Sequence, residues 1–273
     1  MEDVGQTRTG IAEVNGARLY YEVAGAGHPL VLIHAGIADS RMWDDQWNVF
    51  AQHYTVIRYD VRGCGRSVPP PGQFAHHEDL RTLLHFLQIE TAFLLGVSMG
   101  GAIGIEFTLA HPEMVDALVT VGSRAPGARP SDEMIAAWKS VDEVIEAGDI
   151  ERANELELRM WVDGPYRGPD AVDPAVRERV RVMNGNNFLV GSEESEPQPL
   201  EPFAITRLEE IRAPTLVIYG DLDQPDVQQG GEELARRIGG AKKLVMSGAA
   251  HMPSMEQPDE FNRVVLEFLA GLE

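Results

Sequence analysis

Cysteine is nearly absent from this chain of 273 residues, in which Cys64 is the only one. A single cysteine excludes an intramolecular disulfide and any zinc site that needs paired cysteines. Basic residues are also scarce, because 23 Lys and Arg stand against 43 Asp and Glu, and the formal net charge is −20. No segment carries enough basic side chains to neutralise a row of phosphates, so we expect no nucleic-acid partner.

Long hydrophobic runs are absent as well. No apolar run approaches the ~20 residues that span a bilayer, and the opening residues MEDVGQTRTG lack the basic and apolar regions of a signal peptide. We therefore expect a cytoplasmic protein with no membrane partner. The hydrophobic fraction of 44% and the charged fraction of 24% are ordinary for a globular protein, which excludes a disordered or coiled-coil chain. Nothing in the sequence indicates an oligomeric state.

Short apolar runs recur along most of the chain. Gly10–Val23 alternates polar and apolar residues around Asn15-Gly16, a dipeptide typical of a tight β-hairpin turn. Further strands are predicted at Leu30–Ile33, Thr55–Tyr59, Ala92–Val97, Ala117–Val121, Thr215–Tyr219 and Lys243–Met246. Strands this apolar are buried on both faces, and helical patterns separate most of them. The sequence therefore predicts an α/β protein with a largely parallel sheet covered by helices.

The stretch 124–207 interrupts this alternation. It carries helical patterns at Asp132–Ala147, Ile150–Trp161 and Pro174–Met183, followed by the polar run Gly191–Pro202. We predict a core formed by residues 1–123 and 208–273 and a helical cap formed by residues 124–207. Ser131–Glu201 contains 17 Asp and Glu against 7 Lys and Arg, a net charge of −10. This charge fits a solvated outer surface or, alternatively, a surface that repels anions or docks a basic partner.

A candidate nucleophile lies between a predicted strand and a predicted helix. Gly96-Val97-Ser98-Met99-Gly100 fits the pattern G-x-S-x-G, with a strand candidate before it and the helix candidate Gly100–Ala110 after it. This strand–turn–helix setting is that of a nucleophile elbow, in which small flanking residues permit a sharp turn. Ser98 is therefore the predicted nucleophile.

A serine hydroxyl needs a histidine to accept its proton and a carboxylate to orient that histidine. His251 follows the last predicted strand and precedes a C-terminal amphipathic helix, which makes it the best base among eight histidines. Asp221 and Asp223 both follow Gly220. We predict Asp223 as the acid, because it is better placed to turn back over the sheet, and keep Asp221 as the alternative.

The chain resembles the α/β-hydrolase superfamily, and within it most closely the 3-oxoadipate enol-lactonase-like and haloperoxidase-like serine esterases. The resemblance rests on Leu32–Gly36, Asp60–Ser67, Gly96–Gly101, Gly220–Asp223 and Gly248–Gln257, and on the chain order of the predicted nucleophile, acid and base. It covers nearly all of the chain except the cap. It implies the α/β-hydrolase fold, with a mostly parallel eight-stranded sheet, flanking helices and a helical cap.

The resemblance also implies an oxyanion hole and a reaction. The matching backbone N–H groups are those of Met99 and Gly36, with Ile37 as the alternative to Gly36 because Ala35 replaces the glycine usual in the family. His34 would support this loop through hydrogen bonds, and the turn Asp60–Ser67 would be structural. The expected activity is hydrolysis of a small carboxylic ester or lactone through an acyl-enzyme, with neither cofactor nor metal.

The sequence leaves some alternatives to this prediction open and excludes others. The rival class is a small-molecule sensor on the same fold with slow or no turnover, and a perhydrolase or haloperoxidase activity would be a side reaction. Ser98 excludes the aspartyl-ester chemistry of haloalkane dehalogenases and epoxide hydrolases, and Ala35–Ala38 does not match the oxyanion loop usual in C–C bond hydrolases. Pocket lining and core packing are equally open interpretations for five cap residues, Trp138, Met160, Trp161, Met183 and Phe188.

The family resemblance and the acidic composition of the cap predict different charges for the substrate. An enol-lactonase would bind a carboxylate, which needs a cation near the strand ends. Arg124, just past the strand Ala117–Val121, is the basic residue that we place there, and a solvent-facing arginine is the alternative. The acidic cap would lower the local concentration of anions, with partial screening over the ~8 Å Debye length. We therefore predict neutral substrates with short to medium acyl groups.

Overall fold

The computed structural model describes residues 7–190 and 195–272. The first six residues of the opening segment and residues 191–194 of the run Gly191–Pro202 lie outside this description, as does Glu273. Among the described residues, no helix combines the length and apolarity needed to cross a bilayer.

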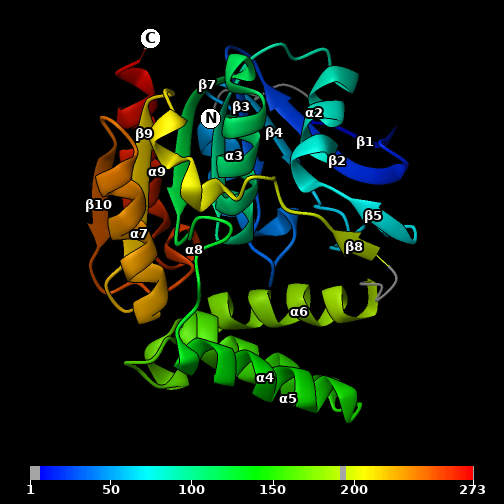
Figure 1. Cartoon of the computed structure of the whole chain (residues 1–273), viewed down its shortest axis with the longest axis vertical. Helices are drawn as coiled ribbons and strands as arrows, with labels where there is room; N and C mark the ends of the chain where they lie inside the picture. The colour runs from blue at the N-terminus through cyan, green and yellow to red at the C-terminus, as the bar shows by residue number, and fades with distance from the viewer. Residues whose placement is uncertain (1–6, 191–194, 273) are drawn as a thin grey trace.

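The central element is a twisted sheet of eight strands in the order β1-β2-β4-β3-β6-β7-β9-β10 (Figure 1). β1 pairs antiparallel with β2, β2 pairs antiparallel with β4, and every other pairing is parallel. The mostly parallel sheet expected from the apolar runs is thereby confirmed. The strands are β1 Arg8–Val14, β2 Ala17–Gly25, β3 Pro29–Ile33, β4 Thr55–Tyr59, β6 Ala92–Val97, β7 Val115–Val121, β9 Thr215–Gly220 and β10 Lys242–Met246.

The opening hairpin also forms as predicted. Val14 pairs with Ala17 across the turn, and Asn15 and Gly16 take φ angles of 48° and 72°. Two consecutive positive φ angles match the twist of the flanking strands, which explains why this dipeptide marks the turn.

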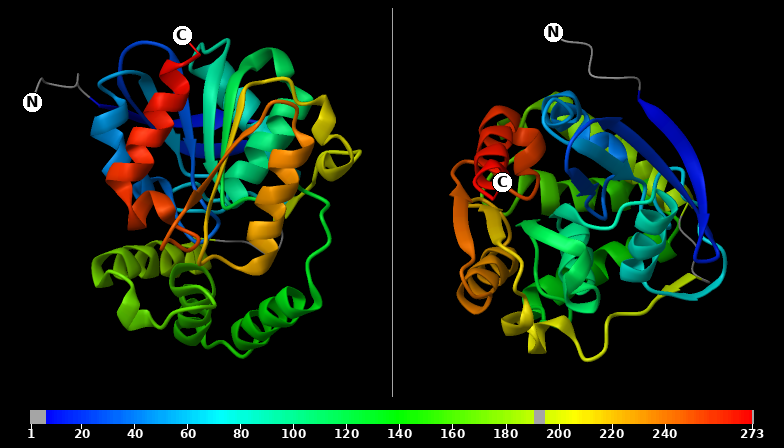
Figure 2. Two further views of the ribbon diagram at one scale, coloured as in Figure 1. Left: turned by 90° about the vertical axis from the view of Figure 1, so that its left-hand side faces the viewer. Right: turned by 90° about the horizontal axis from the view of Figure 1, so that it is seen from above.

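Helices cover both faces of the sheet (Figure 2). Alternate strand residues enter different cores: Leu30 and Leu32 pack with α1 and α9, whereas Val31 and Ile33 pack with α2, α3 and α7. Burial on both faces is the reason that these strands read as continuous apolar runs. The core helices are α1 Asp44–Phe50, α2 His76–Phe86, α3 Met99–Ala110, α7 Pro225–Arg237, α8 Pro253–Glu256 and α9 Pro258–Ala270.

The helices between β7 and β9 lie together at one end of the sheet (Figure 1). They are α4 Asp132–Glu146, α5 Ile150–Glu157, a π-helical turn η3 Leu158–Asp163, and α6 Pro174–Val190. Two expectations need correction. The helix predicted at Ile150–Trp161 changes to π-helix at Leu158, and the helix predicted at Pro174–Met183 continues seven residues further.

The second error has a physical cause. The segment Asn184-Gly185-Asn186-Asn187 carries poor helix formers, which is why the pattern predicted an end at Met183. In the fold, the three asparagine side chains hydrogen-bond to neighbouring segments, so tertiary contacts override local propensity. The sequence also missed a small parallel pairing of β5 Gly72–Phe74 with β8 Ser195–Pro197, each only three residues long.

Candidate active site

The turn after β6 holds Ser98 in a strained conformation. Ser98 has φ 54° and ψ −113°, a region that costs a non-glycine residue about 1–3 kcal/mol. Close packing enforces the turn: a Cβ on Gly96 would fall on the carbonyl oxygen of Gly100, and a Cβ on Gly100 would fall on that of Ile33. The predicted elbow geometry therefore forms, with Ser98 only partly buried.

His251 and Asp223 form a buried pair. The Nδ1 atom of His251 lies 2.8 Å from Oδ2 of Asp223, and the two residues are 2% and 1% exposed. The other oxygen of Asp223 accepts the backbone N–H of Gln224. Asp221 instead accepts hydrogen bonds from Ser247 Oγ and from a backbone N–H in the same loop. Of the two aspartates, Asp223 is the one that the structure joins to His251.

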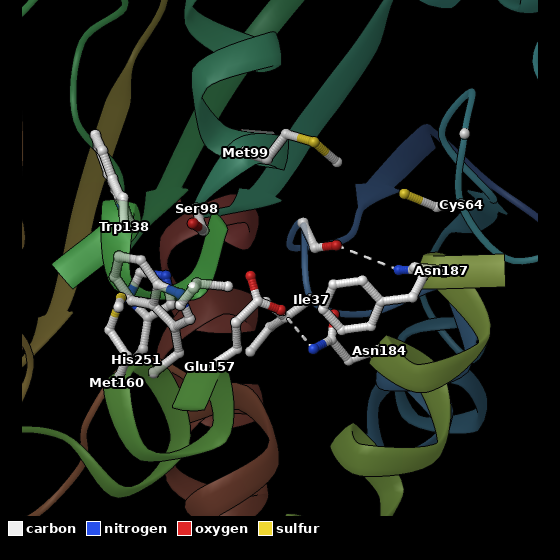
Figure 3. A pocket seen from close by; sticks show the side chains of 15 residues that line it. Ile37, Cys64, Ser98, Met99, Trp138, Glu157, Met160, Asn184, Asn187 and His251 are labelled. Atoms are coloured by element: carbon white, nitrogen blue, oxygen red, sulfur yellow. Dashed lines mark hydrogen bonds between the residues drawn. The ribbon is translucent and has the colours of Figure 1, made fainter. Parts of the chain in front are cut away.

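Ser98 and His251 face one cavity of about 410 Å³ (Figure 3). This volume falls within the range typical of small-molecule sites. The ring of Trp161 packs on that of His251 with centroids 4.5 Å apart, and the carbonyl of Trp161 accepts the backbone N–H of His251. The cavity is lined by Gly36, Ile37, Gly63, Cys64, Ser98, Met99, Trp138, Val141, Glu157, Met160, Trp161, Asn184, Asn187, Phe188 and His251.

Gly36, Ile37 and Met99, the candidates for the oxyanion hole, all line this cavity. Met99 is the first residue of α3, and a Cβ placed on Gly36 would lie 3.8 Å from the Met99 side chain. In the described part of the chain, the N–H groups of these three residues donate to no other group. The geometry brings the predicted donors Gly36 and Met99 close together, and Ile37, which is only 7% exposed, also lines the cavity and stays the alternative to Gly36.

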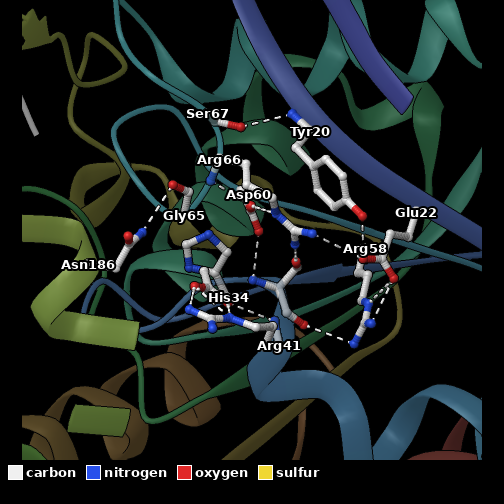
Figure 4. Close-up of polar contacts among 12 residues, drawn as sticks. Tyr20, Glu22, His34, Arg41, Arg58, Asp60, Gly65, Arg66, Ser67 and Asn186 are labelled. Carbon is white, nitrogen blue, oxygen red and sulfur yellow. Dashed lines mark hydrogen bonds and ion pairs between the residues drawn. The ribbon is translucent and has the colours of Figure 1, made fainter. Parts of the chain in front are cut away.

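A buried polar network supports the loop that carries Gly36 (Figure 4). His34 is fully buried; its Nε2 accepts the N–H of Val61, so its Nδ1 carries the proton and donates to the carbonyl of Ala35. Burial lowers the pKa of His34, which keeps the imidazole neutral. The predicted support of the loop by His34 is confirmed.

The turn after β4 is held by Asp60. Its carboxylate accepts the backbone N–H of Ser40 and both the backbone N–H and the Nε–H of Arg66. Burial alone would raise the pKa of Asp60, but the hydrogen bonds from Arg66 and Ser40 hold that pKa below its ordinary value. Cys64 in this turn borders the cavity, and burial raises its thiol pKa to about 12.

The cap also contacts the oxyanion loop. Asn187 of α6 donates to the carbonyls of Gly36 (3.2 Å) and Ala38 (2.8 Å) and accepts the N–H of Gly65 (2.9 Å). The side chain of the neighbouring Asn186 donates to the carbonyl of Gly65 and, within the residues that the structure describes, to no other group. Sequence reasoning missed Asn187; a run of asparagines inside a continuing helix was the only available signal.

The residues that line the cavity decide between alternatives that the sequence leaves open. Trp138, Met160, Trp161 and Phe188 line the cavity, whereas Met183 packs in the core. Arg124 lies at a separate cavity, where its guanidinium donates to the carbonyls of Ala128 and Arg129, and it is not positioned to bind a substrate at Ser98. Two polar lining residues, Glu157 and Asn184, were not anticipated from the sequence.

Comparisons with known proteins agree with this arrangement. Curated relatives include the 2-hydroxy-6-oxo-6-phenylhexa-2,4-dienoate hydrolase of Comamonas testosteroni, 26% identical and covering 92% of this chain and 91% of that protein. The carboxylesterase YbfK of Bacillus subtilis is 25% identical and covers 89% of this chain and 80% of that protein. Among solved structures, the enol-lactonase from Burkholderia xenovorans LB400 has the same fold, with a TM-score of 0.78, 24% identity and coverage of 96% of this chain and 100% of that chain.

The family itself is established by a model described as alpha/beta hydrolase fold, which matches residues 28–258. That range contains six of the eight strands of the sheet, β3 to β10, together with the cap, so the match covers most of the fold and not an isolated motif. On this evidence the chain belongs to the α/β hydrolase fold family, as its sequence motifs predict.

Proposed function

We propose that this hydrolase cleaves carboxylic esters or lactones through an acyl-enzyme on Ser98. The observation that carries the proposal is the buried pair of His251 and Asp223, which opens on the cavity that holds the strained turn of Ser98. We further propose residues 1–123 and 208–273 as the catalytic core and residues 124–207 as a cap that covers it.

The proposed mechanism follows from the protonation states that the contacts require. A carboxylate only accepts hydrogen bonds, so the 2.8 Å contact with Asp223 places a proton on Nδ1 of His251 and leaves Nε2 free as a base. Nε2 takes the hydroxyl proton as Ser98 Oγ attacks the ester carbonyl. The N–H groups of Gly36 and Met99 stabilise the resulting oxyanion.

The intermediate then collapses in two stages. His251 gives its proton to the departing alkoxide, which leaves as an alcohol while the acyl group stays on Ser98. A water molecule, deprotonated by His251, attacks the acyl carbonyl, and the serine oxygen leaves with the returned proton. In a lactone, the alcohol and acid remain one molecule, released as a hydroxy acid.

One relative supports ester cleavage, and the residues that line the cavity argue against an anionic substrate. The Bacillus subtilis relative is a carboxylesterase by name, which agrees with ester cleavage. The Comamonas testosteroni relative is named for a dienoate, an anion, but the cavity here is lined by Glu157 and, among the described residues, by no Lys or Arg. A carboxylate without an opposing cation disfavours an anionic substrate.

A substrate panel tests the proposal. Purified protein is assayed with p-nitrophenyl acetate and butyrate, aliphatic lactones and thioesters, and the product is followed through many turnovers. Sustained release above the rate with Ser98→Ala protein supports an enzyme. A single burst equal to the protein concentration supports the sensor alternative, and turnover only with hydrogen peroxide present, read as peracid, supports a perhydrolase.

A further inference from the structure

One carboxylate in the cavity wall is not used by the proposed mechanism. Glu157 is the last residue of α5, and Figure 3 shows its side chain in the cavity between Ser98 and Asn184. The Nδ2 of Asn184 donates to Oε2 of Glu157 at 2.6 Å, and the same amide group donates to Asn154 Oδ1 at 3.0 Å. The second oxygen of Glu157, Oε1, has no hydrogen-bond or ion-pair partner within the described residues.

Other buried or partly buried carboxylates, unlike Glu157, are paired with cations. Asp163 and Glu155 share the guanidinium of Arg177, and Glu256 pairs with Arg167. Glu157 has only a neutral amide. Burial raises the pKa of Glu157 and Asp142 adds to this, while the hydrogen bond from Asn184 opposes it. A partly desolvated carboxylate without a cation is costly, so its presence in a ligand cavity calls for a ligand that supplies the positive charge.

The rest of the lining fits the same ligand. Trp138, Trp161 and Phe188 line the cavity, and aromatic rings attract cations, especially alkylated ammonium groups. The cap around them is acidic, which raises the local concentration of cations. No Lys or Arg competes for Glu157 among the described lining residues.

We infer that this cavity selects esters that carry an ammonium group, with Glu157 as its counter-ion and the cap aromatic rings around it. This inference rests on the proposed function and specifies its substrate class. Asn184 is a positioning residue, because its amide fixes one oxygen of Glu157 and leaves the other free for the ammonium.

The test uses two isosteric substrates. One is a p-nitrophenyl ester whose acyl chain ends in a trimethylammonium group, and the other ends in a tert-butyl group of the same shape without charge. Because the chain length must match the span from Ser98 to Glu157, both are made with two to six methylene groups. We expect kcat/KM at the best length to favour the cationic ester by about tenfold, which equals about 1.4 kcal/mol.

Two variants distinguish direct contact between the ammonium group and Glu157 from the effect of the overall negative charge of the cap. Glu157→Gln keeps the hydrogen bond from Asn184 but removes the charge, and we expect the ratio of kcat/KM for the cationic ester to kcat/KM for the neutral ester to fall from about tenfold to about one. Glu151→Gln removes the same charge from an exposed position on α5 and should leave the preference intact. Equal cleavage of the two isosteres by wild type, or a preference that survives Glu157→Gln, would overturn the inference.

A binding measurement separates this failure from failure of the proposed function. Tetramethylammonium chloride is titrated into wild type and Glu157→Gln by calorimetry at constant ionic strength. Binding that depends on Glu157, without hydrolysis of any ester, would retain the cation site and reject the hydrolase. Hydrolysis of neutral esters without such binding or preference would retain the hydrolase and reject the cation site.

Discussion

The polar groups at the carboxyl ends of the strands, here called the sheet edge, differ from those of the cap in how completely they are buried and hydrogen-bonded. At the sheet edge, His34, Asp60, Asp223 and His251 are at most 2% exposed, and each is held by specific partners. On the cap, Glu157 is only partly buried and keeps one oxygen without a partner. The core thus orients the groups that we propose for catalysis, whereas the carboxylate that we propose for ligand recognition keeps one oxygen without a partner among the described residues.

The largest predicted effect is at the sheet edge. Replacing Ser98 by alanine removes the nucleophile from a partly exposed turn and relieves its strain little, so the fold should persist. We expect kcat for a p-nitrophenyl ester to fall by about 10⁴- to 10⁶-fold, measured beside the circular dichroism spectrum of the variant. Residual activity within tenfold of wild type would remove Ser98 from the mechanism.

The next effect separates two neighbouring aspartates. Asp223→Asn leaves the shape intact but no longer holds the productive tautomer of His251, and we expect kcat to fall by about 10⁴-fold. Asp221→Asn removes an acceptor only from the loop that carries Ser247, and kcat should change less than about threefold. Steady-state kinetics of the two variants under one condition decide between them, and the reverse ranking would make Asp221 the acid.

A smaller effect is expected where the cap contacts the sheet edge. Asn187→Ala removes the hydrogen bonds to the carbonyls of Gly36 and Ala38, which loosens the oxyanion loop. We expect kcat to fall by about tenfold with little change in KM, as for other residues that orient catalytic groups. Asn186→Ala is the matched control, since that side chain donates to Gly65 and, among the described residues, to no other group. Equal losses in kcat would mean that general cap stability, not the loop, is being measured.

Protonation should destabilise the buried sheet edge. His34 has a lowered pKa in the folded state, so below its unfolded pKa of about 6.5 the unfolded chain binds more protons. The free energy of unfolding should therefore fall as pH decreases from about 6.5 toward 5. His34→Gln should be less stable at pH 7 but show a shallower slope in this window, as measured by urea denaturation. An unchanged slope would assign the pH dependence to other groups.

The cap carboxylate should behave in the opposite way. The pKa of Glu157 is raised in the folded state, so its ionisation opposes folding as pH rises through that value. Glu157→Gln should accordingly leave the protein slightly more stable than wild type at pH 7, in contrast to His34→Gln. Thermal unfolding of both variants measures this contrast, and a marked loss of stability in Glu157→Gln would show that the carboxylate is needed for the fold.

The residues of the sheet edge could be predicted from the sequence because short sequence signals directly after each strand mark them. Each predicted strand of the sheet core formed, and the residues after the strands carried short signals: glycines around Ser98 and a tight loop around His251. Parallel strands then bring their carboxyl ends together without further information. The choice of Asp223 over Asp221 followed from the direction of the turn, and the contact with His251 agrees with it.

The cap could not be predicted to the same depth, because its information is tertiary. Glu157 and Asn184 come from different helices and meet only when α5 and α6 pack, and nothing in the acidic segment distinguishes Glu157 from its exposed neighbours. The end of α6 was misplaced for the same reason, since Asn187 is stabilised by a loop about 150 residues away. Arg124 was considered near the nucleophile from its position after a strand, but its side chain turns toward its own loop.

The central claim is that one strained serine is the nucleophile, and covalent labelling tests it most directly. The protein is treated with a serine-directed fluorophosphonate, digested and mapped by mass spectrometry. The account predicts a single adduct, on Ser98, because Ser123 donates to the carbonyl of Val121 and Ser67 accepts the N–H of Tyr20, both within the buried fold. Labelling of Ser123 or Ser67, or no labelling of the folded protein, would contradict it.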